Sequence, residues 1–149
     1  MNITLKKYFP AQTVGLYEKE EIVSFLHRFL DEFGDPKEDI RNCIEYALNA
    51  GKHPGGLIIS AWDGDTIVGA TIINKTGMAG YIPENILVYI ATHSEYRGKG
   101  IGGQLIERAF KETEGDIALH VEPENPAKKL YEKLGFTNKY LEMRWKRPQ

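Results

Sequence analysis

Cysteine is nearly absent from this chain of 149 residues, which contains only Cys43. A single cysteine excludes an intrachain disulfide and a thiolate cluster around a metal ion. The four histidines show neither His-x-His nor His-Glu-x-x-His spacing, so no metal site is predicted. Cys43 falls on the apolar side of a helical pattern, where we expect it to pack in the core. This cysteine usage is typical of a reducing cytoplasm.

Long apolar runs and a strong charge of either sign are also missing. No stretch reaches the roughly 18 apolar residues of a membrane-spanning helix, and residues 1–10 lack the apolar core of a signal peptide. The net charge is -2, with a pI near 6.1, so a nucleic-acid partner is not expected. The basic tail 144–147 is interpreted as a solvated strand edge. We expect a cytoplasmic protein that does not bind membranes.

The first third of the chain predicts one strand and two helices. Polar and apolar residues alternate over 3–7, and apolar residues recur at helical spacing over 18–30. A capping box predicts the start of the second helix, with Asp35 as N-cap, Pro36 at the first helical position and Glu38 at the third. It is expected to stop at Gly51.

The remainder predicts a sheet with two further helices. A turn at residues 63–65 joins two β-rich runs, and the apolar run 86–92 is expected to be buried on both faces. The predicted elements are strands 57–62, 67–73, 86–92 and 117–121, helices 100–113 and 126–134, and a last strand or hairpin over 136–145. We predict one domain, residues 1–149, with a mixed α/β (α+β) fold: a mostly antiparallel sheet of six to seven strands flanked by about four helices.

Glycine is concentrated between the strand 86–92 and the helix after it, in the run Arg97-Gly98-Lys99-Gly100-Ile101-Gly102-Gly103. Glycines let the backbone approach a ligand closely. The free N–H groups and the dipole of a helix start favour an anion. A phosphate or pyrophosphate site is therefore predicted here.

Two nucleotide-binding motifs compete for this loop. A Walker A loop is excluded, because Lys99 is followed by glycine and not by Ser or Thr. The dinucleotide fingerprint G-x-G-x-x-G is satisfied, with Glu122 at the end of the next strand as its acidic residue. However, a polar loop separates the strand from the first glycine, and about 85 residues of helices and antiparallel strands precede it. A dinucleotide oxidoreductase is therefore the less favoured alternative.

The segment LVYIATHSEYRGKGIGG, residues 87–103, resembles the acetyl-CoA-binding motif R/Q-x-x-G-x-G/A of the GNAT superfamily of N-acetyltransferases. Arg97, Gly100 and Gly102 stand at its defining positions. NPAKKLYEKLGF, residues 125–136, looks like the family's second signature, and the order of elements also matches. The resemblance implies the GNAT fold and acetyl-CoA as co-substrate, with no metal.

The resemblance also implies a binding site for acetyl-CoA. Backbone amides of Arg97, Gly98, Lys99, Gly100, Ile101, Gly102 and Gly103 would hold the pyrophosphate. The strand edge at Ile90, Ala91 and Thr92 would pair with the pantetheine arm as an added strand. Asn125 would reach the pantetheine amides and Lys128 a phosphate, although Asn125 is equally explained as the N-cap before Pro126.

For the chemistry, the resemblance assigns Tyr131 as the general acid that protonates the departing CoA thiolate. The glutamate that many relatives use as base is replaced here by Ile86. Some relatives carry a base on the following strand, where this chain has His120, with Glu122 expected on the same strand face. Glu84 and His93 are weaker candidates, and an already neutral amine needs no base.

Two functional classes follow from the resemblance. The first is N-acetylation of a primary amine on a small molecule, peptide or protein. The second is a CoA-binding module without turnover, for which the missing glutamate is the argument. The acceptor has no motif in the sequence. The C-terminal strand with Trp145 offers an edge for a second copy of the chain, so a homodimer is left open.

Overall fold

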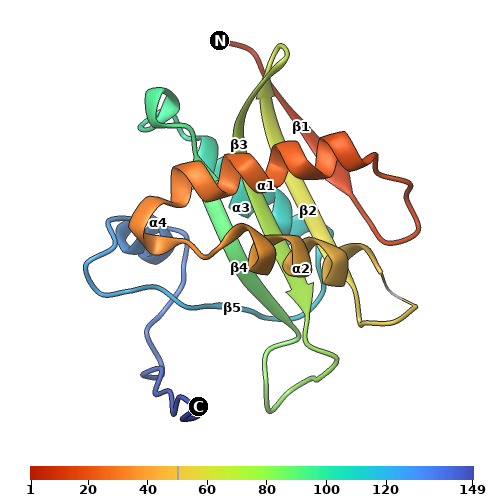
Figure 1. Ribbon diagram of the computed structural model, residues 1–149. Coiled ribbons are helices and arrows are strands. Elements are labelled where there is room, and N and C mark those ends of the chain that lie inside the picture. The colour runs from red at the N-terminus through yellow and green to blue at the C-terminus, as the bar shows by residue number, and fades with distance from the viewer. Residues whose placement is uncertain (50) are drawn as a thin grey trace. The chain divides into compact units, whose positions relative to one another are not determined.

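The computed structural model describes residues 1–49 and 51–149. It divides into two compact units, Met1–Leu119 and His120–Gln149. The first unit contains a sheet and three α-helices, and the second contains one helix (Figure 1). The elements of the first unit are β1 (Ile3–Tyr8), α1 (Leu16–Leu30), η1 (Asp31–Phe33), α2 (Lys37–Leu48), β2 (Gly56–Asp63), β3 (Thr66–Lys75), β4 (Asn85–Thr92), η2 (Ser94–Tyr96), α3 (Ile101–Glu112) and β5 (Ile117–Leu119); the second unit contains α4 (Ala127–Lys133).

The sheet follows the order of the chain, β1-β2-β3-β4-β5. The first four strands are antiparallel neighbours, and β5 lies parallel to β4. The predicted turn between β2 and β3 is confirmed, because Asp63 pairs with Thr66 and Gly64 has φ 60°. Glycine at the first turn position with φ above zero suits the tight hairpins that match strand twist. The parallel pair needs a crossover, which α3 supplies.

The helices cover both faces of the sheet. In Figure 1, α1 and α2 lie in front of the strands and α3 behind them. The core under α1 and α2 includes Leu26, Ile40 and Ile72, none of which has any exposed surface. Burying each such side chain contributes about 1.5–3 kcal/mol. On the other face Gly69 leaves room for α3, since a Cβ there would lie 2.9 Å from Ile101 Cγ2.

The helix α2 begins differently from the prediction. Pro36 is its N-cap, and no side chain caps the helix. The predicted capping box is therefore wrong: Asp35 Oδ2 instead accepts a hydrogen bond of 2.5 Å from the hydroxyl of Tyr89. A buried phenol competes better for this carboxylate than a solvated helix start, because an unpaired hydroxyl in the core is costly. The helix also ends at Leu48, before Gly51.

The strands are fewer than the six to seven predicted. Five are present in the described part of the chain, and residues 136–149 form neither helix nor strand. Alternation over 136–145 is a strand signal, but a strand also needs a neighbour for its backbone hydrogen bonds. The strand β4 is not buried on both faces as expected, since Val88 is 38% exposed and burial alternates along it.

Candidate functional site

The strand β4 has one open edge. Along β3 it is paired from Asn85 to Thr92, but it pairs with β5 only over Asn85–Leu87. The register shifts at this point, because Ile72 pairs with Tyr89 while Ile73 pairs with Leu87, which leaves Val88 as a bulge. Bulges bend a strand and interrupt its ladder. Beyond Val88, β4 has no strand on its second side within the described residues.

The peptide groups of Ile90 and Thr92 point toward this open edge, as the hydrogen bonds of neighbouring residues show. The amide of His93 donates to Val68 O at 2.8 Å, and the carbonyl of Tyr89 accepts from Thr71 Oγ1 at 2.8 Å. Both partners are on β3, and backbone direction alternates along an antiparallel strand. The N–H and C=O groups of Ile90 and Thr92 therefore point away from β3, whereas those of Ala91 point toward it.

The glycine loop follows this edge directly. Gly98 has φ 78° and Gly100, the N-cap of α3, has φ 82°, in a region that L side chains rarely adopt. The first helical hydrogen bond runs from Gln104 N to Gly100 O at 3.0 Å. The amides of residues 101–103 therefore have no acceptor within the helix. With no acidic residue in its first turn, the start of α3 favours an anion.

Aromatic and polar contacts fix the loop to the rest of this unit. The guanidinium of Arg97 donates to the carbonyl of Phe29 at the end of α1, at 3.2 Å. The hydroxyl of Tyr96 donates to Asp63 Oδ2 at 2.7 Å. The ring of His93 lies 4.4 Å from that of Phe29. One guanidinium nitrogen of Arg97 is thus engaged with α1, and the backbone amides of the loop remain the predicted phosphate contacts.

The weaker candidate bases have structural contacts. His93 Nδ1 accepts a hydrogen bond from Glu95 N at 3.1 Å and so caps η2. Glu84 Oε1 accepts one from Asp116 N at 3.1 Å. It stands four residues before the bulge at Val88, roughly 13 Å along the strand. Both side chains hold local backbone in place.

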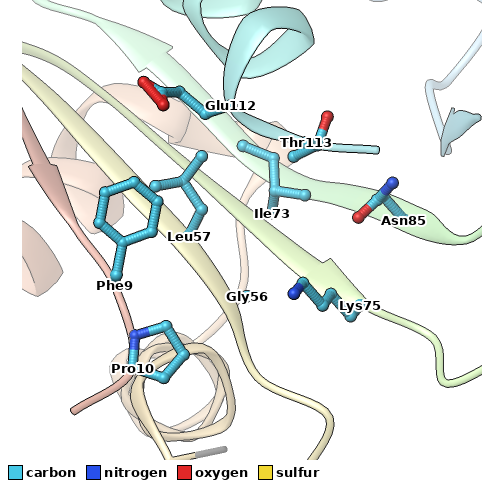
Figure 2. A pocket seen from close by; sticks show the side chains of 9 residues that line it. All are labelled: Phe9, Pro10, Gly56, Leu57, Ile73, Lys75, Asn85, Glu112 and Thr113. Atoms are coloured by element: carbon cyan, nitrogen blue, oxygen red, sulfur yellow. The ribbon is translucent and has the colours of Figure 1, made fainter. Parts of the chain in front are cut away.

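A cavity of about 140 Å³ lies elsewhere in the first unit. Its lining includes Asn85, the first residue of β4, and Glu112, the last residue of α3 (Figure 2). The glycine loop joins the opposite ends of the same two elements. This cavity is therefore separate from the loop and from the open edge. The full lining is Phe9, Pro10, Gly56, Leu57, Ile73, Lys75, Asn85, Glu112 and Thr113.

The second unit contains the other predicted residues. Asn125 Oδ1 accepts a hydrogen bond from Ala127 N, at the start of α4, at 2.9 Å, although the N-cap of this helix is Pro126 and not Asn125. Lys128 is half-buried in the first turn of α4. His120 and Glu122 are exposed and lie outside β5, which ends at Leu119. The expectation that they share a strand face is therefore wrong, since Glu122 O instead closes a turn with Asn125 N at 2.9 Å.

Tyr131 is the only residue of α4 that is buried, with 7% of its surface exposed. Burial raises its pKa from 10.0 to about 12. The ionised phenolate is disfavoured away from water, so the hydroxyl keeps its proton at neutral pH.

Sequence reasoning missed two features of the first unit. The bulge at Val88 has no sequence signal, since Val88 stands in an uninterrupted apolar run. The bond between Tyr89 and Asp35 joins residues 54 positions apart. The local pattern around Asp35 favours a helix cap, and only the folded chain reveals Tyr89 as the competing partner.

Comparison with known proteins identifies the family. A sequence model described as "Acetyltransferase (GNAT) domain" matches residues 54–138, which is more than half of the chain. The chain belongs to the GNAT acetyltransferase family. No curated protein matches. The antiparallel strands before the glycine loop, together with this family assignment, leave the dinucleotide alternative without support.

Solved structures share the fold at low sequence identity. The aminoglycoside N-acetyltransferase AAC(6')-Iy in complex with CoA is 15% identical, with a TM-score of 0.71 over 98% of this chain and 95% of that one. A GNAT family acetyltransferase from Streptococcus pneumoniae is 22% identical, with a TM-score of 0.68 over 99% and 100%. A ribosomal-protein-alanine N-acetyltransferase from Brucella melitensis is 15% identical, with a TM-score of 0.67 over 99% and 100%.

Among residues 1–49 and 51–149, no group of three or more His, Cys, Asp or Glu side chains is arranged to hold a metal ion. No helix in the same part of the chain is long and apolar enough to cross a membrane.

Proposed function

We propose that this chain, acting as one domain over residues 1–149, transfers the acetyl group of acetyl-CoA to a primary amine of a small molecule, peptide or protein. The observation that carries the proposal is the continuity of the open edge of β4 with the anion site at the start of α3. An extended ligand with amides in its middle and a pyrophosphate at one end fits this order. CoA is such a ligand.

The order of groups in CoA indicates where its reactive end lies. With the pyrophosphate at the amides of residues 97–103, the pantetheine amides pair with the free peptide groups of Thr92 and Ile90. Continuing in the same direction brings the thioester to the bulge at Val88. Two neighbouring structures support a CoA ligand and an amine acceptor by their names: AAC(6')-Iy with CoA, and the same enzyme with the bisubstrate analog CoA-S-monomethyl-acetylneamine.

Residues of the second unit have proposed roles as well. The Oδ1 atom of Asn125 is engaged with α4, which leaves its Nδ2 group to donate to a pantetheine carbonyl. The ammonium of Lys128 would pair with a phosphate of CoA. The amine attacks directly in its neutral form, and its proton leaves to water or to His120 or Glu122, which are both exposed.

Tyr131 is proposed as the general acid for the CoA thiolate. Its pKa of about 12 exceeds the ordinary thiol value of about 8.5, so complete proton transfer in water would be unfavourable by about 5 kcal/mol. A bound ligand changes this comparison, because burial also raises the pKa of the thiol by disfavouring the thiolate. The role of Tyr131 is therefore to share or give its proton while the C–S bond breaks.

Binding and turnover measurements test the proposal separately. A ligand at about 100 times its dissociation constant stabilises a protein by about 2.7 kcal/mol. We expect acetyl-CoA and CoA to raise the melting temperature, and an amine library to contain acceptors that release thiol from acetyl-CoA. Stabilisation by acetyl-CoA without thiol release would instead support the non-catalytic CoA-binding module. Stabilisation by NADH but not by acetyl-CoA would contradict both.

A further inference from the structure

A carboxylate is held beside the open part of β4 by a buried tyrosine. The hydroxyl of Tyr89 donates to Asp35 Oδ2 at 2.5 Å. Tyr89 is 8% exposed and packs in the core under α1 and α2, whereas Asp35 is exposed in the connection between these helices. In Figure 1 this connection crosses in front of β4. One tyrosine side chain therefore links β4 to a solvent-exposed negative charge.

The position of Tyr89 along β4 places this charge near the proposed reaction centre. Tyr89 directly follows the bulge at Val88 and directly precedes Ile90, whose peptide groups point to the open edge. The carbonyl of Tyr89 is itself fixed by Thr71 Oγ1. The tyrosine is thus held at its backbone and at its hydroxyl, and it holds the Asp35 carboxylate in one place.

The charge of Asp35 is not balanced by a basic residue. Asp35 belongs to none of the ion pairs formed by the described residues. Lys37, the basic residue closest in sequence, has its Nζ 3.4 Å from Ser24 Oγ. Burial raises the pKa of Tyr89 most, Asp35 raises it further and Asp39 adds a smaller effect, so the nearby charges that act on this hydroxyl include two carboxylates. An exposed carboxylate with one oxygen bound by a phenol has its other oxygen available to a cation.

The chemistry of acetyl transfer restricts which cationic group of an acceptor Asp35 can bind. A carboxylate within hydrogen-bond distance of an amine favours the protonated form, and a protonated amine has no electron pair to attack a thioester. Bound to the attacking nitrogen, Asp35 would hold it in this unreactive form until the proton left to a base. A second nitrogen on the same acceptor has no such conflict, because it stays protonated throughout.

We propose, resting on the acetyltransferase function above, that the acceptor carries a second, cationic nitrogen and that Asp35, positioned by Tyr89, binds it while the neutral nitrogen attacks at the bulge of β4. Asp35 is on this view the specificity-determining residue, and Tyr89 is a positioning residue. The predicted substrate class is diamines and larger polyamines, including aminated compounds with two or more basic nitrogens.

The test compares diaminopentane and diaminooctane with pentylamine and octylamine. Steady-state thiol release at saturating acetyl-CoA gives kcat and KM, and calorimetry with and without CoA gives the affinity of each amine. We expect the wild-type protein to bind at least one diamine about 10-fold or more tightly than the monoamine of equal length. In Asp35→Asn, KM for that diamine rises about 10- to 100-fold, kcat changes less than about 3-fold, and KM for acetyl-CoA is unchanged.

Two variants distinguish the proposed contact from general charge and from misfolding. Glu32→Gln removes an equal charge three residues away, at an exposed position of η1, and is expected to keep the diamine preference. Tyr89→Phe retains the carboxylate but frees it, so KM for the diamine should rise less than in Asp35→Asn. Unchanged acetyl-CoA affinity in all three variants shows that the fold is intact.

The outcomes separate the two proposals. Equal affinity of the wild-type protein for diamines and monoamines, absence of binding of either, or a diamine preference that survives Asp35→Asn overturns the role of Asp35. If calorimetry shows a diamine preference that Asp35→Asn abolishes, yet no amine releases thiol from acetyl-CoA, the cation site stands and the acetyltransferase function fails.

Discussion

The amide nitrogen of Phe136 lies 3.0 Å from the carbonyl oxygen of Tyr131, five residues earlier. A second bond runs from Gly135 N to Glu132 O at 3.1 Å, and Gly135 has φ 103°. These two bonds define the Schellman end of a helix, and the rings of Tyr131 and Phe136, 5.9 Å apart, supply its usual apolar contact. The Gly-Phe pair therefore fixes the carbonyl and the ring of the proposed general acid.

Replacing Tyr131 by phenylalanine tests the acid role with little change in shape. We expect kcat to fall roughly 100- to 10,000-fold, the range typical of a lost general acid. The dissociation constant for acetyl-CoA should change less than about 3-fold, because the ring and its contact with Phe136 remain. Kinetics and calorimetry measure the two quantities. An unchanged kcat would remove Tyr131 from the mechanism.

The same tyrosine predicts a loss of stability at high pH. Its pKa is raised from 10.0 to about 12 in the folded chain, so above pH 10 the unfolded state releases this proton before the folded state does. The contribution of Tyr131 to the free energy of unfolding is therefore fully present below about pH 10 and is lost as the pH rises toward 12. The contribution is at most about 3 kcal/mol. Urea unfolding across this range should show a smaller loss for Tyr131→Phe, and equal losses would contradict the assignment.

Two glycines with similar backbone angles give a matched pair of variants. Gly100→Ala and Gly64→Ala each place a Cβ at positive φ, 82° and 60°, at a cost of about 1–2 kcal/mol of stability. Neither Cβ meets another atom within 4 Å. Only Gly100 adjoins the proposed pyrophosphate site, so only Gly100→Ala should weaken acetyl-CoA binding, by about 10-fold or more. A similar loss of binding in Gly64→Ala would refute the location of the site.

The contact between Gly115 and Glu84 predicts a coupled pair. A Cβ on Gly115 would lie 2.5 Å from the Glu84 carboxyl carbon, and φ there is 82°. We expect Gly115→Ala to lower the free energy of unfolding by about 2–4 kcal/mol. Glu84→Ala removes the clash, so the double variant should be more stable than the sum of the single effects by more than about 0.5 kcal/mol. Denaturant unfolding measures the cycle, and additive effects would contradict this contact.

Local signals in the sequence predicted most of the fold. The hairpin at Gly64, the periodicity of α1 and the glycine start of α3 depend on neighbouring residues alone, and each is confirmed. The predicted end of β5 lies two residues beyond the observed end, because apolar character continues through Val121 although the ladder with β4 stops at Leu119. Strand length depends on the partner, which a single segment does not specify.

The candidate site likewise has some features that the sequence predicts and others that it does not. The glycines at 98 and 100 are recognisable from sequence because positive φ selects glycine. The open edge of β4 depends on the pairing of three strands, and no residue type encodes it. Asp35 shows most clearly what the sequence alone does not predict. The residues around it favour a helix cap, but its carboxylate accepts a hydrogen bond from the hydroxyl of Tyr89 on a distant strand.

The free peptide groups of Ile90 and Thr92 also affect how the protein behaves when empty. An exposed strand edge pairs readily with any extended chain, including another copy of the same protein. A pantetheine arm lying along this edge would occupy those groups and leave no template for such pairing. Saturation with CoA during purification and storage would then suppress aggregation, a benefit in handling separate from catalysis.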